Sequence, residues 1–339
     1  MKKLFMLIVS LVLLTTLLGG CGSNAPDGKS GNAAAATTAA ASPEATQKAA
    51  SSEAPSSGFP RTYTDMAGHE VTIAEKPKRV AVAFFHFVEP WFALGITPVA
   101  GDGSDTLLGG FLSLQPYADQ KSQVTDLGSP LNLEALLEAK PDLIVSATPY
   151  NDEIYEQLKA IAPVVVLNNE LDWKTRLLEF SKLVGEEEKA QAKIAEIESQ
   201  IGSSRTELAG LKDKTVAFLG LNNKGGFTAY GIDRCAAFYD TGAGLGLTPP
   251  DGYPAVHGQN NQFTIEGIVK LNPDYIFVWD DATTDADETA LAQLKGNAIW
   301  NTLSAVQNGK VFMLDRSAFS GGPLGVEYGV KSVAEAMLR

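Results

Sequence analysis

The feature of this sequence that most constrains its fold is an internal repeat. The segment Asn132-Leu-Glu-Ala-Leu-Leu-Glu-Ala-Lys-Pro-Asp-Leu-Ile-Val is matched by Thr264-Ile-Glu-Gly-Ile-Val-Lys-Leu-Asn-Pro-Asp-Tyr-Ile-Phe at a constant offset of 132 residues. In each copy a short helix ends before Pro-Asp and leads into an apolar strand. A chain of 339 residues is long enough to bury two cores. The repeat therefore predicts two related lobes.

Apolar strands alternate with helical stretches throughout the folded part of the chain. A hairpin is predicted over 61–73, where alternation surrounds Ala67-Gly68. The other predicted strands are 79–84, 98–100, 143–147, 164–167, 215–220, 275–279 and 311–315, and the predicted helices are 87–94, 133–139, 153–161 and 326–338. Such alternation predicts an α/β fold in which each lobe is a mostly parallel sheet flanked by helices.

A helical segment separates the two series of strands. Residues 173–184 and 186–211 have helical spacing with Gly185 between them, and Ile194, Ile197 and Ile201 recur three and four residues apart. The heptads do not persist long enough for a coiled coil, so one long helix joining two lobes is the better interpretation. The predicted divisions are an N-terminal lobe over 59–170, a connecting helical segment over 171–211 and a C-terminal lobe over 212–339.

The N-terminus has the pattern of an export signal. Lys2 and Lys3 precede an apolar run over 4–18, which is too short to cross a ~30 Å hydrocarbon core comfortably. The run ends in Leu18-Gly19-Gly20-Cys21, which resembles the lipobox of bacterial lipoproteins. The sequence thus predicts a signal peptide over 1–20 and a lipidated Cys21, whose two or three acyl chains would anchor the chain stably. The alternative is an ordinary cleaved signal in which the next cysteine is incidental.

Residues 21–58 are expected to form the lipidated cysteine and a disordered tether. From residue 22 onward this stretch is rich in Ala, Ser, Thr, Pro and Gly and has almost no large apolar side chain to bury. A flexible chain of this length spans roughly 35 Å from end to end. A globular body held this close to a membrane is expected to have its partner in that membrane.

Composition excludes several classes of function. The chain has 27 Lys and Arg against 40 Asp and Glu, which argues against nucleic acid and against an electrostatic attachment to anionic lipid. With only Cys21 and Cys235, a disulfide scaffold is excluded. The three histidines, His69, His86 and His257, are scattered singly, which makes a multi-histidine metal site improbable.

From residue 61 onward the sequence resembles the siderophore-type substrate-binding lipoproteins of bacterial ABC importers, a class that includes cobalamin and haem binders. The stretches that carry the resemblance are 63–82 (YTDMAGHEVTIAEKPKRVAV), the first repeat copy, 153–166 (EIYEQLKAIAPVVV), 185–190 and 298–314 (AIWNTLSAVQNGKVFML). The resemblance implies two α/β lobes joined by one long helix, with the ligand held between them. It also implies that the protein is a monomer and not an enzyme. Its expected location is the extracytoplasmic face of the cell membrane of a Gram-positive bacterium.

Ligands of open α/β sheets lie beyond the carboxyl ends of the strands, so residues directly after strands are the candidates for the ligand site. These candidates are Phe84, Phe85, His86, Tyr150, Tyr230, Arg234, Trp279, Arg316 and Phe319. A ferric siderophore has its iron already wrapped by oxygens, so the protein needs no cofactor or metal ligands of its own. It needs apolar walls and a few donors, which the two arginines could supply. Alternatively, each aromatic ring belongs to a core, and each arginine pairs with a nearby acid such as Asp233 or Asp315.

The first-lobe loops bear on the type of ligand. Loops 84–86, 101–105 and 148–150 contain no Lys or Arg, which favours hydroxamate or citrate-type siderophores over trianionic catecholates. His86 could be a cleft donor or a haem ligand, although a satisfied loop histidine is the favoured interpretation. Haem or cobalamin binding is the alternative within the same fold. A secreted enzyme is disfavoured because the sequence has no G-x-S-x-G, no H-E-x-x-H and no plausible Cys-His pair, and an adhesion module because extended all-β patterning is absent.

Glu134 and Glu266 occupy the same place in the two repeat copies. The resemblance implies that these glutamates project from the tops of the two lobes and meet arginines of the permease dimer. The alternative is an ordinary exposed glutamate near a helix N-terminus, where the helix dipole stabilises it by a few tenths of a kcal/mol. Their equivalent positions favour docking. Exposed ion pairs of this kind are expected to set register and association rate more than affinity.

Overall fold

The computed structural model describes residues 58–221, 226–279 and 294–339, which belong to one compact unit. The predicted signal peptide, Cys21 and nearly all of the predicted tether lie outside the described residues. Within the described part of the chain, no helix combines the length and the apolar character that a membrane span requires.

The first lobe is built on a five-stranded parallel sheet in the order β5-β4-β3-β6-β7. Its strands are β3 (Val80–Val82), β4 (Ala100–Gly101), β5 (Thr125–Asp126), β6 (Leu143–Thr148) and β7 (Val164–Asn168). The predicted hairpin is confirmed as β1 (Arg61–Thr64) and β2 (Glu70–Ile73), which pair antiparallel. The helices are α1 (Glu89–Ala93), α2 (Ser104–Gly110), α3 (Leu133–Glu138) and α4 (Tyr155–Lys159), with 3-10 turns η1 (Phe85–Phe87), η2 (Leu112–Gln123) and η3 (Asp152–Ile154).

The second lobe has a five-stranded sheet in the order β10-β9-β8-β11-β12. Its strands are β8 (Val216–Leu221), β9 (Phe227–Ala229), β10 (Gln262–Phe263), β11 (Tyr275–Trp279) and β12 (Val311–Leu314). Strands β8, β11 and β12 are parallel, whereas β9 and β10 are antiparallel to their neighbours. The helical elements are α7 (Ala236–Tyr239), α8 (Ile265–Leu271), α10 (Ser304–Gln307) and α11 (Pro323–Met337), with η5 (Trp300–Thr302) and η6 (Arg316–Phe319).

The repeated segment occupies the same place in both lobes. Helices α3 and α8 precede β6 and β11, and each of these strands is fourth in its sheet order. The Pro-Asp carboxylate explains why the segment recurs, because it tethers the chain just before the neighbouring strand. Asp142 accepts hydrogen bonds from the backbone N–H groups of Lys78 (2.8 Å) and Arg79 (2.9 Å). Asp274 accepts one from the backbone N–H of Thr215 at 2.9 Å.

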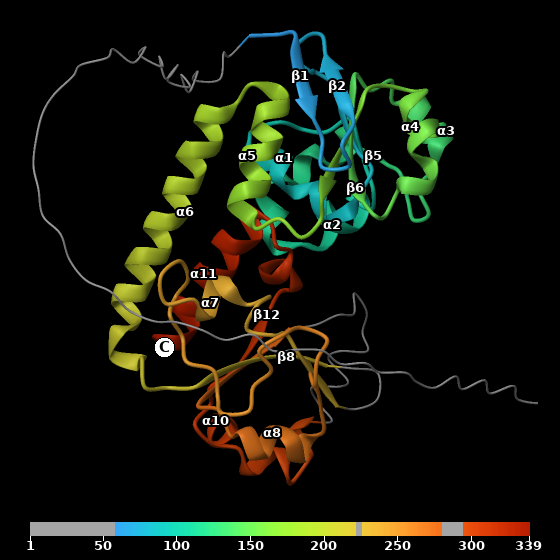
Figure 1. Cartoon of the computed structure of the whole chain (residues 1–339). Helices are drawn as coiled ribbons and strands as arrows, with labels where there is room; N and C mark the ends of the chain where they lie inside the picture. Colours follow the sequence, from blue (N-terminus) through green and yellow to red (C-terminus); the bar gives the residue numbers. More distant parts are fainter. Residues whose placement is uncertain (1–57, 222–225, 280–293) are drawn as a thin grey trace, which may run out of the picture. The chain divides into compact units, whose positions relative to one another are not determined.

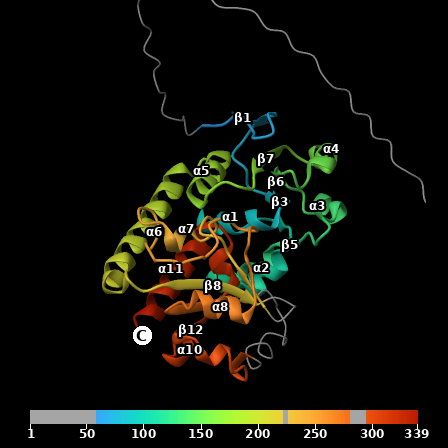
Figure 2. The same cartoon turned by 60° about the horizontal axis from the view of Figure 1, so that its bottom comes forward.

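Two helices occupy the predicted connecting segment, α5 (Trp173–Val184) and the long helix α6 (Glu187–Glu207). Gly185 between them has φ 66°, the left-handed conformation that suits glycine at a helix end. The 21 residues of α6 extend about 31 Å at 1.5 Å per residue. Ala190 lies in the first-lobe core, and Ile197 and Ile201 lie in the second-lobe core. One helix therefore packs against both lobes, and Figures 1 and 2 show it alongside α11.

Helix α11 is the second element shared by the lobes. Leu324 at its N-terminal end is buried in the first-lobe core, while Val326, Val330 and Val333 are buried in the second. It begins three residues before the predicted start at residue 326, because Pro323 is pre-organised for the first helical position.

Candidate functional site

The predicted ligand residues separate into two aromatic groups, one on each lobe. On the first lobe, the first wall consists of Phe84, Phe85, His86 and Tyr150. The ring of Phe84 lies 4.5 Å from that of Tyr150 and 5.5 Å from that of His86, and Phe85 contacts His86 edge-on at 5.3 Å. Phe84 is only 6% exposed and Tyr150 is 61% exposed, so Phe84 supports the wall from the core while Tyr150 presents its ring to solvent.

On the second lobe, the second wall consists of Tyr230, Trp279 and Phe319. Tyr230 and Phe319 stack with centroids 4.9 Å apart and planes 5° apart, and Trp279 lies 4.7 Å from Tyr230. Trp279 is 6% exposed, and its ring covers Gly220 so closely that a Cβ there would lie 2.3 Å from a ring carbon. The Trp279 indole N–H is buried and has no hydrogen-bond partner among the described residues, so the ring forms the back of this wall.

The two predicted arginines flank the second wall and differ in their partners. Arg234 is exposed and forms an ion pair with Glu170 of the first lobe, with Nη2 and Oε2 3.1 Å apart. The guanidinium of Arg316 lies above the ring of Phe111, 5.3 Å from its centroid. In the described part of the chain no carboxylate lies within ion-pair distance of Arg316. Among the described residues its guanidinium therefore keeps donors from which an anionic group could accept hydrogen bonds.

The structure does not contain the ion pairs considered from sequence proximity. Asp233 instead accepts a hydrogen bond from the backbone N–H of His257 at 2.9 Å. Asp315 caps η6 by accepting from the Ser317 N–H at 3.0 Å, and it accepts from the first-lobe Leu112 N–H at 3.2 Å. Both acids are occupied with backbone donors, which leaves the arginines to other partners.

His86 on the first wall faces the cationic side of the second lobe. Its side chain is exposed, although the rings of Phe84 and Phe85 pack against it and keep water from part of the imidazole. This restricted hydration lowers the pKa of His86 to about 4, and the nearby charges of Arg176, Arg234 and Arg316 lower it further, against the opposing effect of a hydrogen bond to the Ser320 backbone. His86 is therefore a neutral imidazole at pH 7.

A cavity of about 320 Å³ adjoins these residues between the β7–α5 loop and the second lobe. Glu170 and Arg176 line it from the first lobe, and Arg234, Phe238 and Phe319 from the second. Of the nine predicted ligand residues it contains Arg234 and Phe319. The other seven lie outside its lining.

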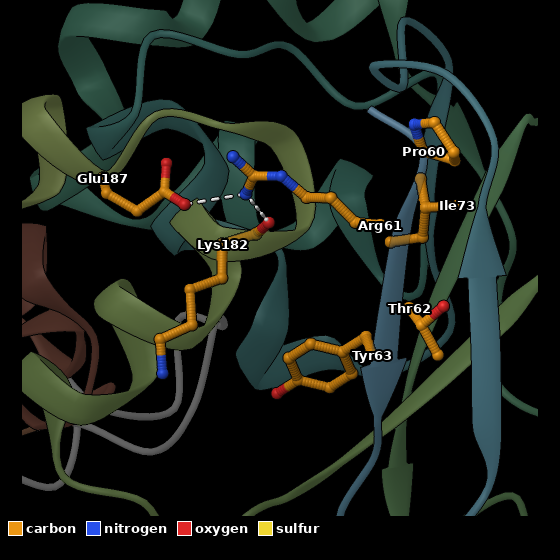
Figure 3. Close-up of a pocket in the computed structure, with 7 residues that line it drawn as sticks. All are labelled: Pro60, Arg61, Thr62, Tyr63, Ile73, Lys182 and Glu187. Carbon is orange, nitrogen blue, oxygen red and sulfur yellow. Dashed lines mark hydrogen bonds and ion pairs between the residues drawn. The ribbon is translucent and has the colours of Figure 1, made fainter. Parts of the chain in front are cut away.

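A different cavity, of about 350 Å³, lies where the β1–β2 hairpin meets the α5–α6 corner, and Figure 3 shows its lining. Its charged groups are already paired, because Arg61 contacts Glu187 at 2.7 Å and also donates to the Lys182 carbonyl. Tyr63 donates to Glu179 at 2.5 Å. No predicted ligand residue lines this cavity, and its contacts hold the hairpin to the corner.

Sequence reasoning missed Arg176 and Phe111. Arg176 is 4% exposed and donates to the carbonyls of Asn169 and Leu171 in its own lobe and of Gly321 in the other. One signal was available: Arg176 lies on the same helical face as Trp173, Leu177 and Phe180, where the period demands an apolar residue. Phe111 lies in a loop and carries no comparable signal.

The two repeat glutamates lie at equivalent helix positions. Glu134 is the second residue of α3 after its cap Asn132, and Glu266 is the second residue of α8 after its cap Thr264. Both side chains are exposed, and neither forms an ion pair with a described residue. Hydrogen bonds from its own backbone N–H and from the Thr264 hydroxyl lower the pKa of Glu266. Both are charged, solvent-facing groups at helix N-termini.

Metal ligation by the protein has no candidate within the described ranges. There, no three His, Cys, Asp or Glu side chains gather closely enough to hold a metal ion.

Comparison with known proteins gives consistent matches. A family model described as periplasmic binding protein matches residues 88–318. The Bacillus subtilis iron(3+)-hydroxamate-binding protein YxeB is 26% identical over 347 residues, covering 100% of this chain and 98% of that protein. The Bacillus subtilis Fe(3+)-citrate-binding protein YfmC is 27% identical over 94% of this chain and 91% of its own length.

Solved structures show the same fold. The petrobactin-binding protein YclQ from Bacillus subtilis has a TM-score of 0.67 at 22% identity, covering 82% of this chain and 98% of that chain. Staphylococcus aureus SirA complexed with staphyloferrin B has a TM-score of 0.64 at 22% identity and the same coverage. The two-lobed α/β architecture with its long helix is therefore shared with these proteins.

Proposed function

Because the chain belongs to the periplasmic binding protein family, we propose that it captures a ferric siderophore outside the cytoplasm and delivers it to the permease of an ABC importer. The observation that carries this proposal is that each lobe bears a cluster of aromatic side chains at the predicted positions, with Arg234 and Arg316 on the second lobe. Relatives that cover nearly the whole chain are named for binding iron(3+)-hydroxamate and Fe(3+)-citrate. Their names support an iron-chelate ligand of the same kind.

The chemistry of the walls suits a ligand whose iron is already enclosed. Aromatic faces such as those of Tyr230 and Phe319 supply apolar contact area, and guanidinium groups recognise carbonyl and carboxylate oxygens. Arg316 has no ion-pair partner among the residues that the structure describes. The pair of Arg234 with the exposed Glu170 is weak, because solvent screens both partners, so an anionic ligand could replace the glutamate.

The distribution of charge favours citrate-type and hydroxamate ligands and gives them an orientation. Within the candidate site the cations come from the second lobe and from α5, and the first-lobe loops 84–86, 101–105 and 148–150 supply none. An anionic or oxygen-rich side of the ligand would face Arg234 and Arg316. Its apolar side would face Phe85, Tyr150 and the neutral His86.

Delivery would use the lipid anchor and the exposed glutamates of the two lobes. We place a lipid anchor at Cys21, the N-terminal lobe at 59–170, the connecting segment at 171–211 and the C-terminal lobe at 212–339. A monomer anchored on the extracytoplasmic face would meet the permease dimer through Glu134 and Glu266. The protein itself supplies no catalysis and no resident cofactor in this scheme.

A fluorescence titration tests the ligand class. The full chain in detergent is titrated with ferrioxamine B, ferric citrate, a ferric catecholate, haem and cobalamin, and tryptophan emission is followed because Trp279 lies in the second wall. We expect saturable quenching by ferrioxamine B or ferric citrate at the lowest concentration. A Soret band with haem, and no saturable response to any iron chelate, would assign the haem alternative instead.

A further inference from the structure

A buried carboxylate of the first lobe holds the start of α11. Glu89, at the first position of α1, is 2% exposed. Its Oε2 accepts a hydrogen bond from the Ser320 hydroxyl at 2.6 Å, and its Oε1 accepts from the Gly325 N–H at 2.8 Å. Ser320 directly follows Phe319 of the second wall. The contact therefore joins the first lobe to the chain segment that carries that wall.

Glu89 takes the place of a helix cap that α11 lacks. The N-cap of this 15-residue helix is Gly322, which has no side chain to accept from the free N–H groups of the first turn. A carboxylate is favoured at this positive end of the helix. The fit is close, because a Cβ on Gly322 would lie 2.5 Å from Glu89 Oε1 and would require the Glu89 carboxylate to move.

Arg176 makes the matching contact from α5. Its Nη1 donates to the Gly321 carbonyl at 3.1 Å, while its Nη2 donates to Asn169 at 2.9 Å and Leu171 at 3.1 Å in the first lobe. The guanidinium also lies over the ring of Phe87, 5.4 Å from its centroid. Two buried side chains of the first lobe, one acidic and one basic, thus hydrogen-bond to residues 320–325 of the second.

This crossing differs from the one made by α6. The long helix contacts both lobe cores through apolar side chains, which tolerate small sliding movements, and its ion pair of Lys193 with Glu327 is only partly buried. Fully buried hydrogen bonds to Glu89 and Arg176 lose much of their energy when donor and acceptor separate. We propose that Glu89 and Arg176 are positioning residues of the ligand site, which set the separation of the two walls by fixing residues 320–325 and, through them, Phe319 and Arg316. The proposal rests on the proposed function only in naming the ligand.

A distance measurement tests the positioning without any ligand. Nitroxide labels are placed at two exposed positions, Glu153→Cys on the first lobe and Gln259→Cys on the second, in the full chain with Cys21→Ser, since Cys235 is buried. We expect a narrow distance distribution in the parent and a broader one in Glu89→Ala. Glu89→Gln, which keeps an acceptor for Gly325, should lie between them.

The matched control is Glu187→Ala. Like Glu89, Glu187 is a glutamate at the first position of a helix with a side chain that is largely covered. It pairs with Arg61 and does not contact residues 320–325. It should lose stability without widening the distribution. If folded Glu89→Ala and Glu187→Ala give the same distribution as the parent, the proposal is overturned. Should Glu89→Ala fail to fold, Ser320→Ala, which removes one donor only, decides by the same measurement.

The ligand readout uses ferric citrate and ferrioxamine B. Dissociation of whichever complex binds should be roughly tenfold faster from Glu89→Ala, equivalent to about 1.4 kcal/mol. Glu89→Gln should restore most of the parent rate, and Glu187→Ala should match the parent. If neither complex binds any variant, the proposed function fails while the distance measurement still decides the positioning role. A broadened distribution with an unchanged dissociation rate would overturn the link to the ligand site.

Discussion

On the first lobe the candidate wall is aromatic and carries the neutral His86, whereas on the second lobe the stacked Tyr230 and Phe319 lie beside two arginines. The outer parts of the lobes are far more alike. Asp142 and Asp274 tether equivalent strands, and Glu134 and Glu266 are the second residues of equivalent helices. The shared features build the frame, and the features that differ are the residues predicted to contact the ligand. This difference would let the proposed site orient its ligand even though the lobes repeat each other.

The largest effect should come from the shared feature. Replacing Glu134 and Glu266 together by Ala should abolish most transport, since a permease arginine would lose its partner on each side. Affinity for the iron chelate should change by less than about 0.5 kcal/mol, as for surface changes far from a site. Uptake into vesicles and a fluorescence titration measure the two quantities.

The single variants test whether the lobes are equivalent in docking. Glu134→Ala and Glu266→Ala should impair transport to a similar degree, and Lys at either position should be worse than Ala, because like charges then repel. Normal uptake by the double variant, or loss of chelate binding in it, would contradict the docking assignment.

The second prediction concerns the walls themselves. Arg316→Ala should weaken binding of ferric citrate by about 1 to 3 kcal/mol, the range for loss of a charged hydrogen bond. Tyr230→Ala should cost a similar amount through its lost aromatic contact. Phe85→Ala on the first wall should weaken binding by less, and the loss that it causes should not change with salt concentration. Titrations of the three variants at two salt concentrations measure these losses. If the losses caused by Phe85→Ala and Arg316→Ala depend equally on salt, the positive charge is not confined to the second wall.

The third prediction uses the pKa of His86. In the folded chain this pKa is lowered to about 4 from 6.5, so between these values the unfolded chain binds more protons. Stability contributed by the neutral imidazole is therefore complete above pH 6.5 and is lost as the pH falls towards 4. His86→Gln should make the unfolding free energy less dependent on pH in this window. Urea unfolding at pH 7.5, 5.5 and 4.5 measures it, and parallel pH profiles for the variant and the parent would exclude this role for His86.

The local sequence pattern predicted much of the fold, because hairpins, helices and the repeated segment depend on residues that are close together in the sequence. The hairpin, both connecting helices and strand β11 lie where the spacing indicated. The antiparallel pairing of β9 and β10 was missed, since it depends on residues about 34 positions apart. Helix η2 was missed as well. Its 12 residues form a 3-10 helix with Pro116 inside it, so they lack the spacing of an α-helix.

The site was less predictable than the fold for the same physical reason. Sequence proximity suggested Asp233 as the partner of Arg234, but the partner is Glu170, 64 residues away on the other lobe. The aromatic residues predicted after strands form two clusters of ring contacts, one on each lobe, and their role as ligand residues stays a prediction. Which of them are core and which are surface depends on packing, as the exposures of Phe84 and Tyr150 show.

The smallest predicted effect is at the end of the repeat helix. Lys140 and Asn272 occupy equivalent positions, and both are left-handed, with φ 48° and 41°. This conformation costs most side chains roughly 1 to 2 kcal/mol, but asparagine adopts it readily. Lys140→Gly should therefore raise the unfolding free energy by about 0.5 to 1 kcal/mol, after allowance for the greater freedom of glycine in the unfolded chain.

Asn272→Gly should bring no gain, because little strain is relieved and a hydrogen bond is lost. The Asn272 Oδ1 accepts from the Ser304 N–H at 3.3 Å, and glycine leaves that donor without its partner. Lys140→Asn is the matched control and should recover part of the gain of Lys140→Gly. Urea unfolding of the three variants measures these differences. If Lys140→Gly and Asn272→Gly shift stability equally, the two copies of the repeat carry the same strain, and the comparison between them fails at this position.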